Sequence, residues 1–574
     1  MILARPEPAS HLKANVKRSP RTRKSSANLM RVYMPTPSRS IFFKVSICSA
    51  PALREGETKL QIANGNLPIP NHQIANPKCP VPAFIPSALL PTTKGCILAY
   101  RYKQMNPLWP EFILAFAAVI VSCGFPSDCA ASEVRVGVAM VDITPPPGIP
   151  MAGYYHERGA DGVLDPLYSK AMVIESGGER AALVVLDLIS IRRAITDNAR
   201  AAIEKTTGIK AGSVMISATH AHTGPELTDP GQVASVLPEQ KRLVIDYSEG
   251  LPGRIVESVR LANERLQAAQ LAVAEGRCED LTFNRRYFMR DGSVGWNPGK
   301  RNANIVMPAG PSDTEVKLLY VERPGANGPT QSIATYVNFA MHPDTCGGNK
   351  ISADWPGALS RVLGGYHGTN HATLVANGTC GNLNHVDTSW AWPQGTAIEQ
   401  HRIATILGAS VFQAYKHLTP LATGPIHAKS QFVELELPHT TTEEVQEAKQ
   451  TLDATKDDRD GNFMKLVRAN RALDIAARQG KPYRVEVQVI ALGKDVAWVS
   501  LPGEIFVELG LAIKKRSPFP HTFLVELANE SVGYVPDRRS YSEGNYEPES
   551  ARCAAGSGEK LVEAAVTVLT ELHK

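Results

Sequence analysis

Short, continuously apolar runs rich in valine and isoleucine recur from residue 134 to the C-terminus; they include AALVVLDLIS, SVMISAT, SIATYVNFA, ATLVAN and VAWVS. Runs of this kind are typical of strands that are covered on both faces, because neither face then needs polar side chains. Amphipathic stretches separate them, and the helices that these predict lie at residues 195–207, 238–269, 395–418, 441–479 and 558–573. The sequence therefore predicts an α/β fold in which mixed β-sheets are flanked by helices.

Residues 132–574 are expected to form one domain of a size usual for an enzyme, because no internal repeat and no long Pro/Gly linker divides them. Charge is distributed unevenly around this domain. Residues 1–104 carry 16 Lys+Arg against 3 Asp+Glu, whereas residues 132–574 hold 45 basic and 51 acidic residues. The net charge of +5 for the whole chain therefore comes from the N-terminal segment and gives no reason to expect nucleic acid as a partner.

Residues 1–104 are dense in Pro, Ser, Lys and Arg and show no sustained periodicity. A segment of this composition buries too little apolar surface to offset the entropy lost on ordering, so we expect a disordered basic extension. Two origins remain open for it. It is either a genuine tail or an upstream extension ahead of a true translation start at Met105.

Residues 105–131 have the features of a signal peptide. The apolar core at 112–121 has the length of a signal-peptide core and is too short for a normal membrane span. Small residues at 129–131 follow, where a signal peptidase could cut. We therefore expect export to a periplasmic or extracellular location, and the stretch IVSC, which ends at Cys123, leaves a lipid-anchored form as an alternative.

Four cysteines remain after residue 131, namely Cys278, Cys346, Cys380 and Cys553. They form no CxxC motif, so neither a thiolate metal site nor a dense disulfide framework is indicated. One or two disulfides could form after export, but the sequence leaves their pairing open.

Four of the apolar runs lead directly into histidine, amide or carboxylate side chains. The residues concerned are His220 and His222 after SVMISAT, His342 and Asp344 after SIATYVNFA, Asn384, His385 and Asp387 after ATLVAN, and Glu504 after VAWVS. Ligand sites in α/β sheets gather beyond the carboxyl ends of strands. Neutral imidazole and carboxylate are the usual ligands of a catalytic zinc ion. A single histidine at a strand end is more often a polar group with a local hydrogen bond than a metal ligand. Four strand ends with such side chains make a metal site as plausible as local hydrogen bonding.

Eight motifs occur in order between Val134 and the C-terminal region: VGVAMVDITPPPGIPMAGY, DPLYSKAMVI, ISATHAHTGPE, NRR, NFAMHPDT, NGTCGNL, SLPGEIFVELG and LANESVGYVPDRRSYSEGNYE. Each motif is weak alone, but the ordered set resembles the neutral/alkaline non-lysosomal ceramidase family. That family consists of zinc-dependent amide hydrolases that cleave N-acylsphingosine into sphingosine and a fatty acid. The resemblance implies a ceramidase-like catalytic domain, zinc as cofactor and a role in sphingolipid metabolism.

The resemblance also implies the site residues. The zinc ligands would be His220, His342, Glu504 and Tyr534. His222 would assist a zinc ligand or bind the oxyanion that develops on the substrate carbonyl, and Arg285 of the NRR motif would be an active-site arginine. Asp344, His385 and Asp387 are further candidates for a general base or for orienting a ligand, although a structural hydrogen bond in a turn explains each of them equally well.

The turn GNLNHVD departs from the family pattern. Ceramidases carry here a serine with a direct part in catalysis, followed by a proline, whereas this chain has Asn384 and His385. An amide side chain cannot become a nucleophile, so the chemistry is expected to use metal-activated water, with Asn384 as a hydrogen-bond partner. The residues after Tyr534 are also too few for the immunoglobulin-like module of characterised members, and no apolar loop for taking up a lipid is evident.

These features together predict an exported zinc-dependent hydrolase that cleaves the amide bond of a small-molecule or lipid N-acyl compound. Two alternatives stay open: a zinc hydrolase of the same fold acting on a carbohydrate, lactone or other polar substrate, and a non-catalytic metal-containing binding protein. A peripheral contact with a membrane and the oligomeric state also stay open.

Overall fold

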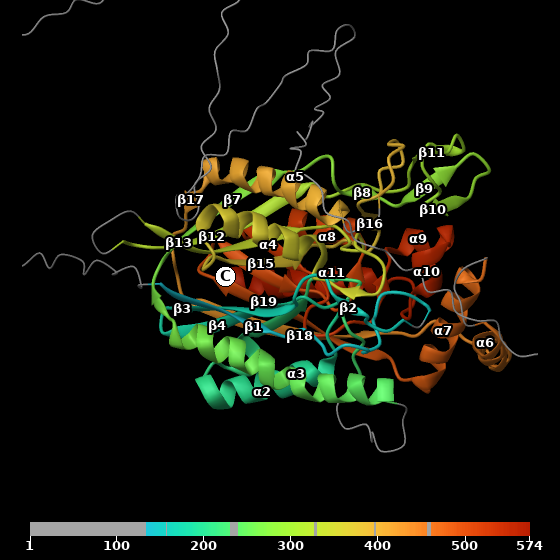
Figure 1. Ribbon diagram of the computed structural model, residues 1–574, viewed down its shortest axis with the longest axis horizontal. Helices are drawn as coiled ribbons and strands as arrows, with labels where there is room; N and C mark the ends of the chain where they lie inside the picture. The colour runs from blue at the N-terminus through green and yellow to red at the C-terminus, as the bar shows by residue number, and fades with distance from the viewer. Residues whose placement is uncertain (1–133, 157, 230–238, 326–329, 395–397, 456–460) are drawn as a thin grey trace, which may run out of the picture. The chain divides into compact units, whose positions relative to one another are not determined.

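Three larger β-sheets, each covered by helices, make up most of the described chain (Figure 1). The computed structural model describes residues 134–574 except 157, 230–238, 326–329, 395–397 and 456–460. The predicted extension at 1–104 and the predicted signal peptide at 105–131 lie outside the described residues, which belong to one compact unit. None of the described helices combines the length and the apolar character needed to cross a membrane. The predicted fold class, mixed β-sheets flanked by helices, is confirmed.

The first sheet has the strand order β5-β4-β3-β1-β6. Its strands are β1 (Arg135–Asp142), β3 (Tyr168–Ser176), β4 (Glu179–Leu186), β5 (Val214–Ala218) and β6 (Gln267–Ala268). Strands β1, β3 and β4 pair antiparallel, and helix α2 (Arg193–Thr207) then carries the chain across so that β5 lies parallel to β4. Helix α3 (Glu239–Glu264) follows β5.

The second and third sheets repeat this topology. The second, β15-β13-β12-β7-β17, contains β7 (Gln270–Arg277), β12 (Glu315–Arg323), β13 (Gln331–Phe339), β15 (Ala372–Asn377) and β17 (Thr419–Pro420). The third, β18-β19-β20-β22, contains β18 (Ile426–Leu435), β19 (Tyr483–Leu492), β20 (Val496–Ser500) and β22 (His521–Val525). In each, an antiparallel trio is extended by one parallel strand. The crossover helices are α4 (Asp354–His367) and α8 (Val507–Arg516), and later helices α5 (Glu399–Ala414) and α11 (Ser557–His573) complete the two units. A sequence in which we expected no repeat thus folds with a repeated topology.

Most predicted helices are present with shifted ends. Helices α2, α3, α5 and α11 fall within or close to the predicted segments. The single helix predicted at 441–479 is wrong, because the structure has two helices there, α6 (Thr442–Ala454) and α7 (Phe463–Ala477). Gly461 precedes α7 with a φ of +78°, a conformation through which a right-handed helix cannot continue. Helices α4 and α8 were not predicted: α4 contains a proline and three glycines, and α8 directly follows an apolar run.

The inner faces of the three sheets share one apolar core. Leu183 of the first sheet, Tyr336 and Leu374 of the second, and Trp498 and Phe523 of the third belong to the same buried cluster. Helices α2 and α3 cover the outer face of the first sheet, and α4 and α5 cover that of the second (Figure 1). Helices α8 and α11 pack on the third sheet. Full burial of each large apolar side chain contributes about 1.5–3 kcal/mol, so the shared core ties the three units together.

Backbone hydrogen bonds join the ends of the edge strands beyond this core. The amide of Ala218, at the end of β5, donates to the carbonyl of Leu527, which follows β22. The amide of Glu526 donates to the carbonyl of Asn377, the last residue of β15. The carboxyl ends of the three parallel edge strands therefore meet at one place.

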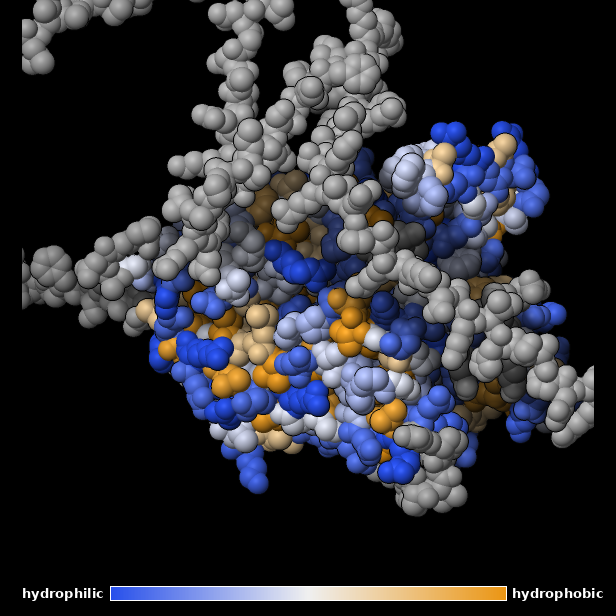
Figure 2. Space-filling view, in the orientation of Figure 1, coloured by the Kyte–Doolittle hydropathy of each residue, from blue (hydrophilic) through white to orange (hydrophobic). Residues whose placement is uncertain are grey.

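Further short elements complete the described secondary structure. They are β2 (Gly162–Val163), β8 (Phe283–Asn284), β9 (Arg286–Met289), β10 (Val294–Trp296), β11 (Ile305–Pro308), β14 (Lys350–Ile351), β16 (Leu383–Asn384), β21 (Glu504–Ile505), β23 (Tyr534–Val535), α9 (Arg538–Glu543), α10 (Tyr546–Ser550) and the 3₁₀ turns Ala211–Ser213 and Tyr415–His417. Two of the pairings carry predicted site residues: β16 with β8, and β21 with β23. On the face of the molecule that Figure 2 shows, hydrophilic and apolar side chains are intermixed where residues are coloured.

Candidate metal centre

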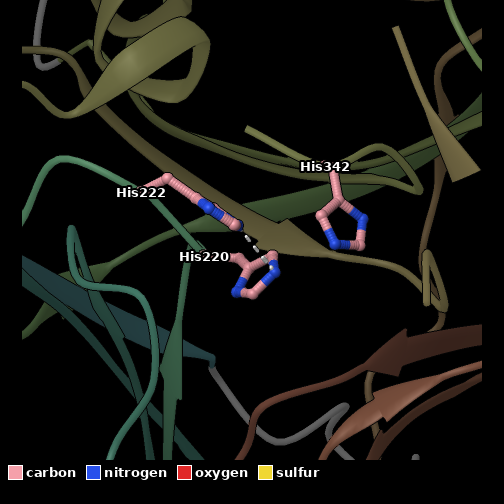
Figure 3. Close-up of side chains that lie close together, drawn as sticks. All are labelled: His220, His222 and His342. Carbon is pink, nitrogen blue, oxygen red and sulfur yellow. Dashed lines mark hydrogen bonds between the residues drawn. The ribbon is translucent and has the colours of Figure 1, made fainter. Parts of the chain in front are cut away.

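Three buried histidines lie together beyond the carboxyl ends of β5 and β13 (Figure 3). His220 and His222 follow β5, and His342 follows β13. One ring nitrogen from each lies within 4.8 Å of the others, and the Nε2 atoms of His220 and His222 are 3.2 Å apart. His220 adopts a φ of +74°, an uncommon conformation for a residue with a side chain, which is found mainly where surrounding structure imposes it. The structure therefore brings together three residues that are separated in sequence.

Backbone carbonyl groups fix the orientation of all three imidazoles. Each Nδ1 lies 2.8–3.1 Å from carbonyl oxygen; the pairs are His220 with Ile189, His222 with Gly153, and His342 with Cys380 and Leu383. A carbonyl oxygen only accepts, so each Nδ1 carries the proton and each Nε2 carries a lone pair. Two such Nε2 atoms cannot bond to each other without an intervening proton or cation. The donor set therefore fits a metal ion.

Glu504 adds a carboxylate to this set. Its Oε2 lies 3.3 Å from the Nε2 atoms of both His220 and His342. Burial alone would raise the pKa of Glu504, but the two histidines outweigh burial and hold the pKa well below its usual value. Burial likewise lowers the pKa of His220, and Glu504 outweighs it and raises this pKa. Both shifts favour a positive charge between these side chains. Where no metal ion is bound, a proton supplies that charge.

Tyr534 lies beside the same cluster. It is the pairing partner of Glu504 in the short sheet of β21 and β23, and its ring stacks on His342 with ring centroids 6.4 Å apart. Its hydroxyl accepts a hydrogen bond of 3.1 Å from Arg285. Burial raises the pKa of Tyr534 well above its usual value, Glu504 adds to this, and Arg285 opposes it. The structure places Tyr534 next to the predicted ligands, and its role as a ligand stays a prediction.

Arg285 is held on the Tyr534 side of the cluster. Its guanidinium donates to Oε1 of Glu547 at 2.7 Å and to the carbonyl of Gly381 at 2.7 Å. Glu547 is fully buried and also accepts from Arg286 at 3.1 Å. The hydrogen bonds that Glu547 accepts from both arginines fix the position of Arg285. Glu547 was not recognised in the sequence, because the glutamate that pairs with a buried arginine has no local signature.

The opposite side of the cluster is formed by residues near His222. Asp344 has an Oδ1 4.0 Å from Nδ1 of His222, and it accepts a hydrogen bond of 2.7 Å from the hydroxyl of Tyr154. Burial lowers the pKa of His222 to about 4, with Asp344 opposing the shift, so the ring is neutral near pH 7. Tyr154 was missed as a site residue, although it ends the first of the eight motifs. The glycine before it, Gly153, has a φ of +106° and supplies the carbonyl that orients His222.

Asn384 ends the short strand β16, and His385 begins the turn that follows it. The amide of Asn384 donates to Oδ1 of Asn297 at 3.0 Å and accepts from the backbone amide of Val386 at 3.1 Å. His385 is only 4% exposed, and neither ring nitrogen has a hydrogen-bond partner among the described residues. Asp387 accepts bonds from the backbone and side chain of Ser389, which is the turn role considered above.

A buried acidic group lies beneath His342. Glu526 accepts hydrogen bonds from the backbone amides of Cys380 and Ile505, at 3.1 and 3.0 Å, and from the thiol of Cys380 at 2.9 Å. Burial raises the pKa of Glu526 to about 8. The four described cysteines, Cys278, Cys346, Cys380 and Cys553, are all buried and free. The structure therefore contains none of the disulfides considered from the sequence, and Cys380 instead packs under the cluster.

Residues 134–363 match the family model "Neutral/alkaline non-lysosomal ceramidase, N-terminal". This segment belongs to the neutral/alkaline ceramidase family. Its residues include His220, His222, Arg285 and His342 of the predicted site. The resemblance stated from the ordered motifs is thus confirmed.

Two solved structures are similar to this chain. One is the crystal structure of neutral ceramidase from Pseudomonas aeruginosa, with a TM-score of 0.57 and 20% identity over 77% of this chain and 75% of that one. The other is a ceramidase complexed with C2, with a TM-score of 0.57 and 18% identity over 77% and 76% of the two chains. A comparison with curated proteins gave no significant match. At these identities the structural likeness establishes the ceramidase fold.

Replacing Gly381 with alanine should lower the free energy of unfolding by about 1–3 kcal/mol, the usual effect of overpacking. A Cβ atom at this position would lie 2.5 Å from the carbonyl oxygen of Glu504, so the backbone that carries Glu504 would have to move. Urea unfolding of the purified protein measures the change. The matched control is Gly250→Ala in α3, where a Cβ meets nothing within 4 Å and helix propensity should raise stability by up to about 1 kcal/mol. Equal stability of the wild type and Gly381→Ala would contradict this packing.

Proposed function

We propose that this chain is a zinc-dependent hydrolase that cleaves the amide bond of an N-acyl compound. The observation that carries the proposal is the convergence of three imidazole Nε2 lone pairs and the Glu504 carboxylate at one buried place. Membership of the matched segment in the ceramidase family supports a hydrolase. Nitrogen and carboxylate oxygen are the ligands that catalytic zinc prefers.

His220, His342 and Glu504 would hold the ion together with one further group. The resemblance favours Tyr534 as that group, and the geometry also offers His222, whose Nε2 lies 3.2 Å from that of His220. Zinc at such a site lowers the pKa of water and polarises the carbonyl of the substrate. The remaining groups then decide where the substrate lies and where its protons go.

The Nε2 atom of His222 is better suited to accept a hydrogen bond or to bind the ion than to donate a hydrogen bond. Its Nδ1 proton is used by the carbonyl of Gly153, and the pKa of about 4 keeps the ring neutral, so Nε2 presents a lone pair. The oxyanion-binding role implied for His222 by the resemblance would need a second proton on this ring. Arg285 is a permanent cation on the other side of the cluster and is the more suitable group to stabilise negative charge on a substrate carbonyl.

Purified protein loaded with zinc should contain about one ion per chain by elemental analysis, as expected for a single site. His342→Ala should lose both the ion and hydrolysis of N-acyl substrates, whereas His401→Ala, an exposed histidine in α5, should retain both. The zinc content of the His222→Ala and Tyr534→Phe variants shows which of these two residues is the fourth ligand. Only the variant that has lost a true ligand should bind zinc weakly. A folded His342→Ala protein that keeps its zinc would show that the ligand is wrongly placed.

The substrate is tested by two parallel incubations of the zinc-loaded protein. One uses a fluorescent short-chain ceramide, and the other uses a panel of N-acetylated sugars and lactones. Release of the acyl group from ceramide alone would support the ceramidase-like activity. Cleavage only in the panel would support the polar-substrate alternative, which Asn384 at the serine position favours. No turnover of any compound by protein that binds zinc would favour the non-catalytic binding protein.

We also infer that the protein is exported, on the basis of the apolar segment at 112–121 and the small residues after it. N-terminal sequencing of protein recovered from the periplasm or medium of a bacterial host should give a start close to residue 132. Labelling with a radioactive fatty acid would identify the lipid-anchored alternative. Full-length protein that stays in the cytoplasm would overturn export.

A further inference from the structure

His385 is a buried imidazole whose hydrogen-bonding capacity is unused by the chain. Both Nδ1 and Nε2 lack a partner in the described part of the structure, although the side chain is only 4% exposed. A neutral imidazole has one donor and one acceptor, and leaving such a group unpaired costs about 1–3 kcal/mol. The backbone around it is fixed, because Gln394 donates to the carbonyl of His385 at 2.8 Å and to Glu399 at 3.1 Å. The ring is thus held in place without a partner.

The position of His385 relates it to the metal centre. Burial lowers the pKa of His385, and the shift is opposed by Asp344, whose carboxylate lies 4.0 Å from Nδ1 of His222. The preceding residue, Asn384, bonds to Asn297, whose backbone amide donates to the carbonyl of Arg285 at 2.8 Å. The turn that carries His385 is therefore connected to both sides of the cluster.

A second side chain, next to Asn297 in the chain, also has an unpaired hydrogen-bond donor. Nε1 of Trp296 is buried and has no partner within the described residues, and Trp296 is the neighbour of Asn297 in the chain. Its ring packs against Tyr546 with centroids 4.6 Å apart, and Tyr546 packs against Tyr534 at 5.3 Å. Aromatic rings that continue from the cluster are thus accompanied by two ring N–H groups and two side-chain amides. An entirely apolar substrate would leave the ring nitrogens of His385 and Trp296 unpaired.

We propose that His385 is a substrate-binding residue that hydrogen-bonds a hydroxyl group of the substrate, so that the enzyme selects hydroxylated N-acyl compounds. The proposal rests on the amide hydrolase function proposed above, and it adds the feature of the substrate that His385 would recognise. A hydroxyl both donates and accepts, which matches the two ring nitrogens of a neutral imidazole. Sites built to bind a substrate hydroxyl reject the analogue that lacks it, because the buried protein groups then stay unpaired. Hydroxyls beside an amide-bearing carbon occur in both sphingoid lipids and amino sugars, so the substrate could come from either source.

Two matched pairs of substrates test the proposal on the full zinc-loaded chain. The lipid pair is a fluorescent short-chain ceramide and the same acyl group on octadecylamine, which lacks the hydroxyls. The sugar pair is N-acetylglucosamine and N-acetylcyclohexylamine. The wild type should prefer the hydroxylated member of one pair. The pair that shows this preference identifies the substrate as a sphingoid lipid or an amino sugar. His385→Ala should lower kcat/KM for this member by about 10- to 100-fold, mainly through KM, and change that of its partner less than about twofold.

Controls separate binding from structure. His385→Gln keeps a donor and an acceptor and should recover part of the selectivity, whereas His401→Ala should leave it unchanged. Zinc content and thermal unfolding are measured on each variant, and the glutamine variant decides the case if the alanine variant does not fold. If His385→Ala lowers kcat/KM equally for both members of a pair, or for neither of them, the proposal is overturned.

A calorimetric binding experiment distinguishes this proposal from the proposed reaction. If the wild type cleaves none of the four compounds, the amide hydrolase function fails. Weaker binding of a hydroxylated compound to His385→Ala than to the wild type would still support the role of His385. If the wild type binds no hydroxylated compound, or both proteins bind it equally, His385 is not the binding residue.

Discussion

The hydrogen bonds from three imidazole Nδ1 atoms to backbone carbonyls determine the chemistry of this protein. They fix one tautomer in His220, His222 and His342 and turn three Nε2 lone pairs toward one another. Lone pairs in this arrangement repel unless a positive charge lies between them. The negative charge of Glu504 stabilises a positive charge at this place further. Because the acceptors are backbone groups of separate segments, the orientation of each ring depends on the fold as a whole.

The repeated sheet topology explains how such distant segments meet. In each larger sheet a crossover helix places an edge strand parallel to its neighbour, so that both strands end on the same side. Loops after such ends carry His220 and His222 in the first sheet, His342 in the second and Glu504 in the third. The backbone bonds from Ala218 and Glu526 then connect the three ends directly. These backbone bonds hold the three units together, which would suit the preorganised site of the proposed hydrolase.

The two flanks of the cluster differ in chemistry. Arg285, held by Glu547, provides a fixed cation beside Tyr534, whereas Asp344 and Tyr154 provide polar groups beside His222. The turn with Asn384 and His385 has amide and imidazole groups where the ceramidase resemblance implies a serine and a proline. In the proposed reaction this turn contributes recognition of the substrate and leaves the attack on the amide to water. The divergence at two residues would then alter selectivity while the metal centre is retained.

The sequence by itself determined the fold class and most helices, and it pointed to His220, His222, His342 and Glu504 as candidate site residues, because apolar runs and the side chains that follow them are local patterns. It also carried the family resemblance through eight ordered motifs. Only the tertiary structure decided that the sheets share one topology, that Thr442–Ala454 and Phe463–Ala477 are separate helices and that the four described cysteines are free. It likewise decided the tautomer of His222, the pairing of Arg285 with Glu547 and the unused nitrogens of His385. These features depend on contacts between residues far apart in the chain, and no local pattern records which carbonyl or carboxylate a buried side chain will meet.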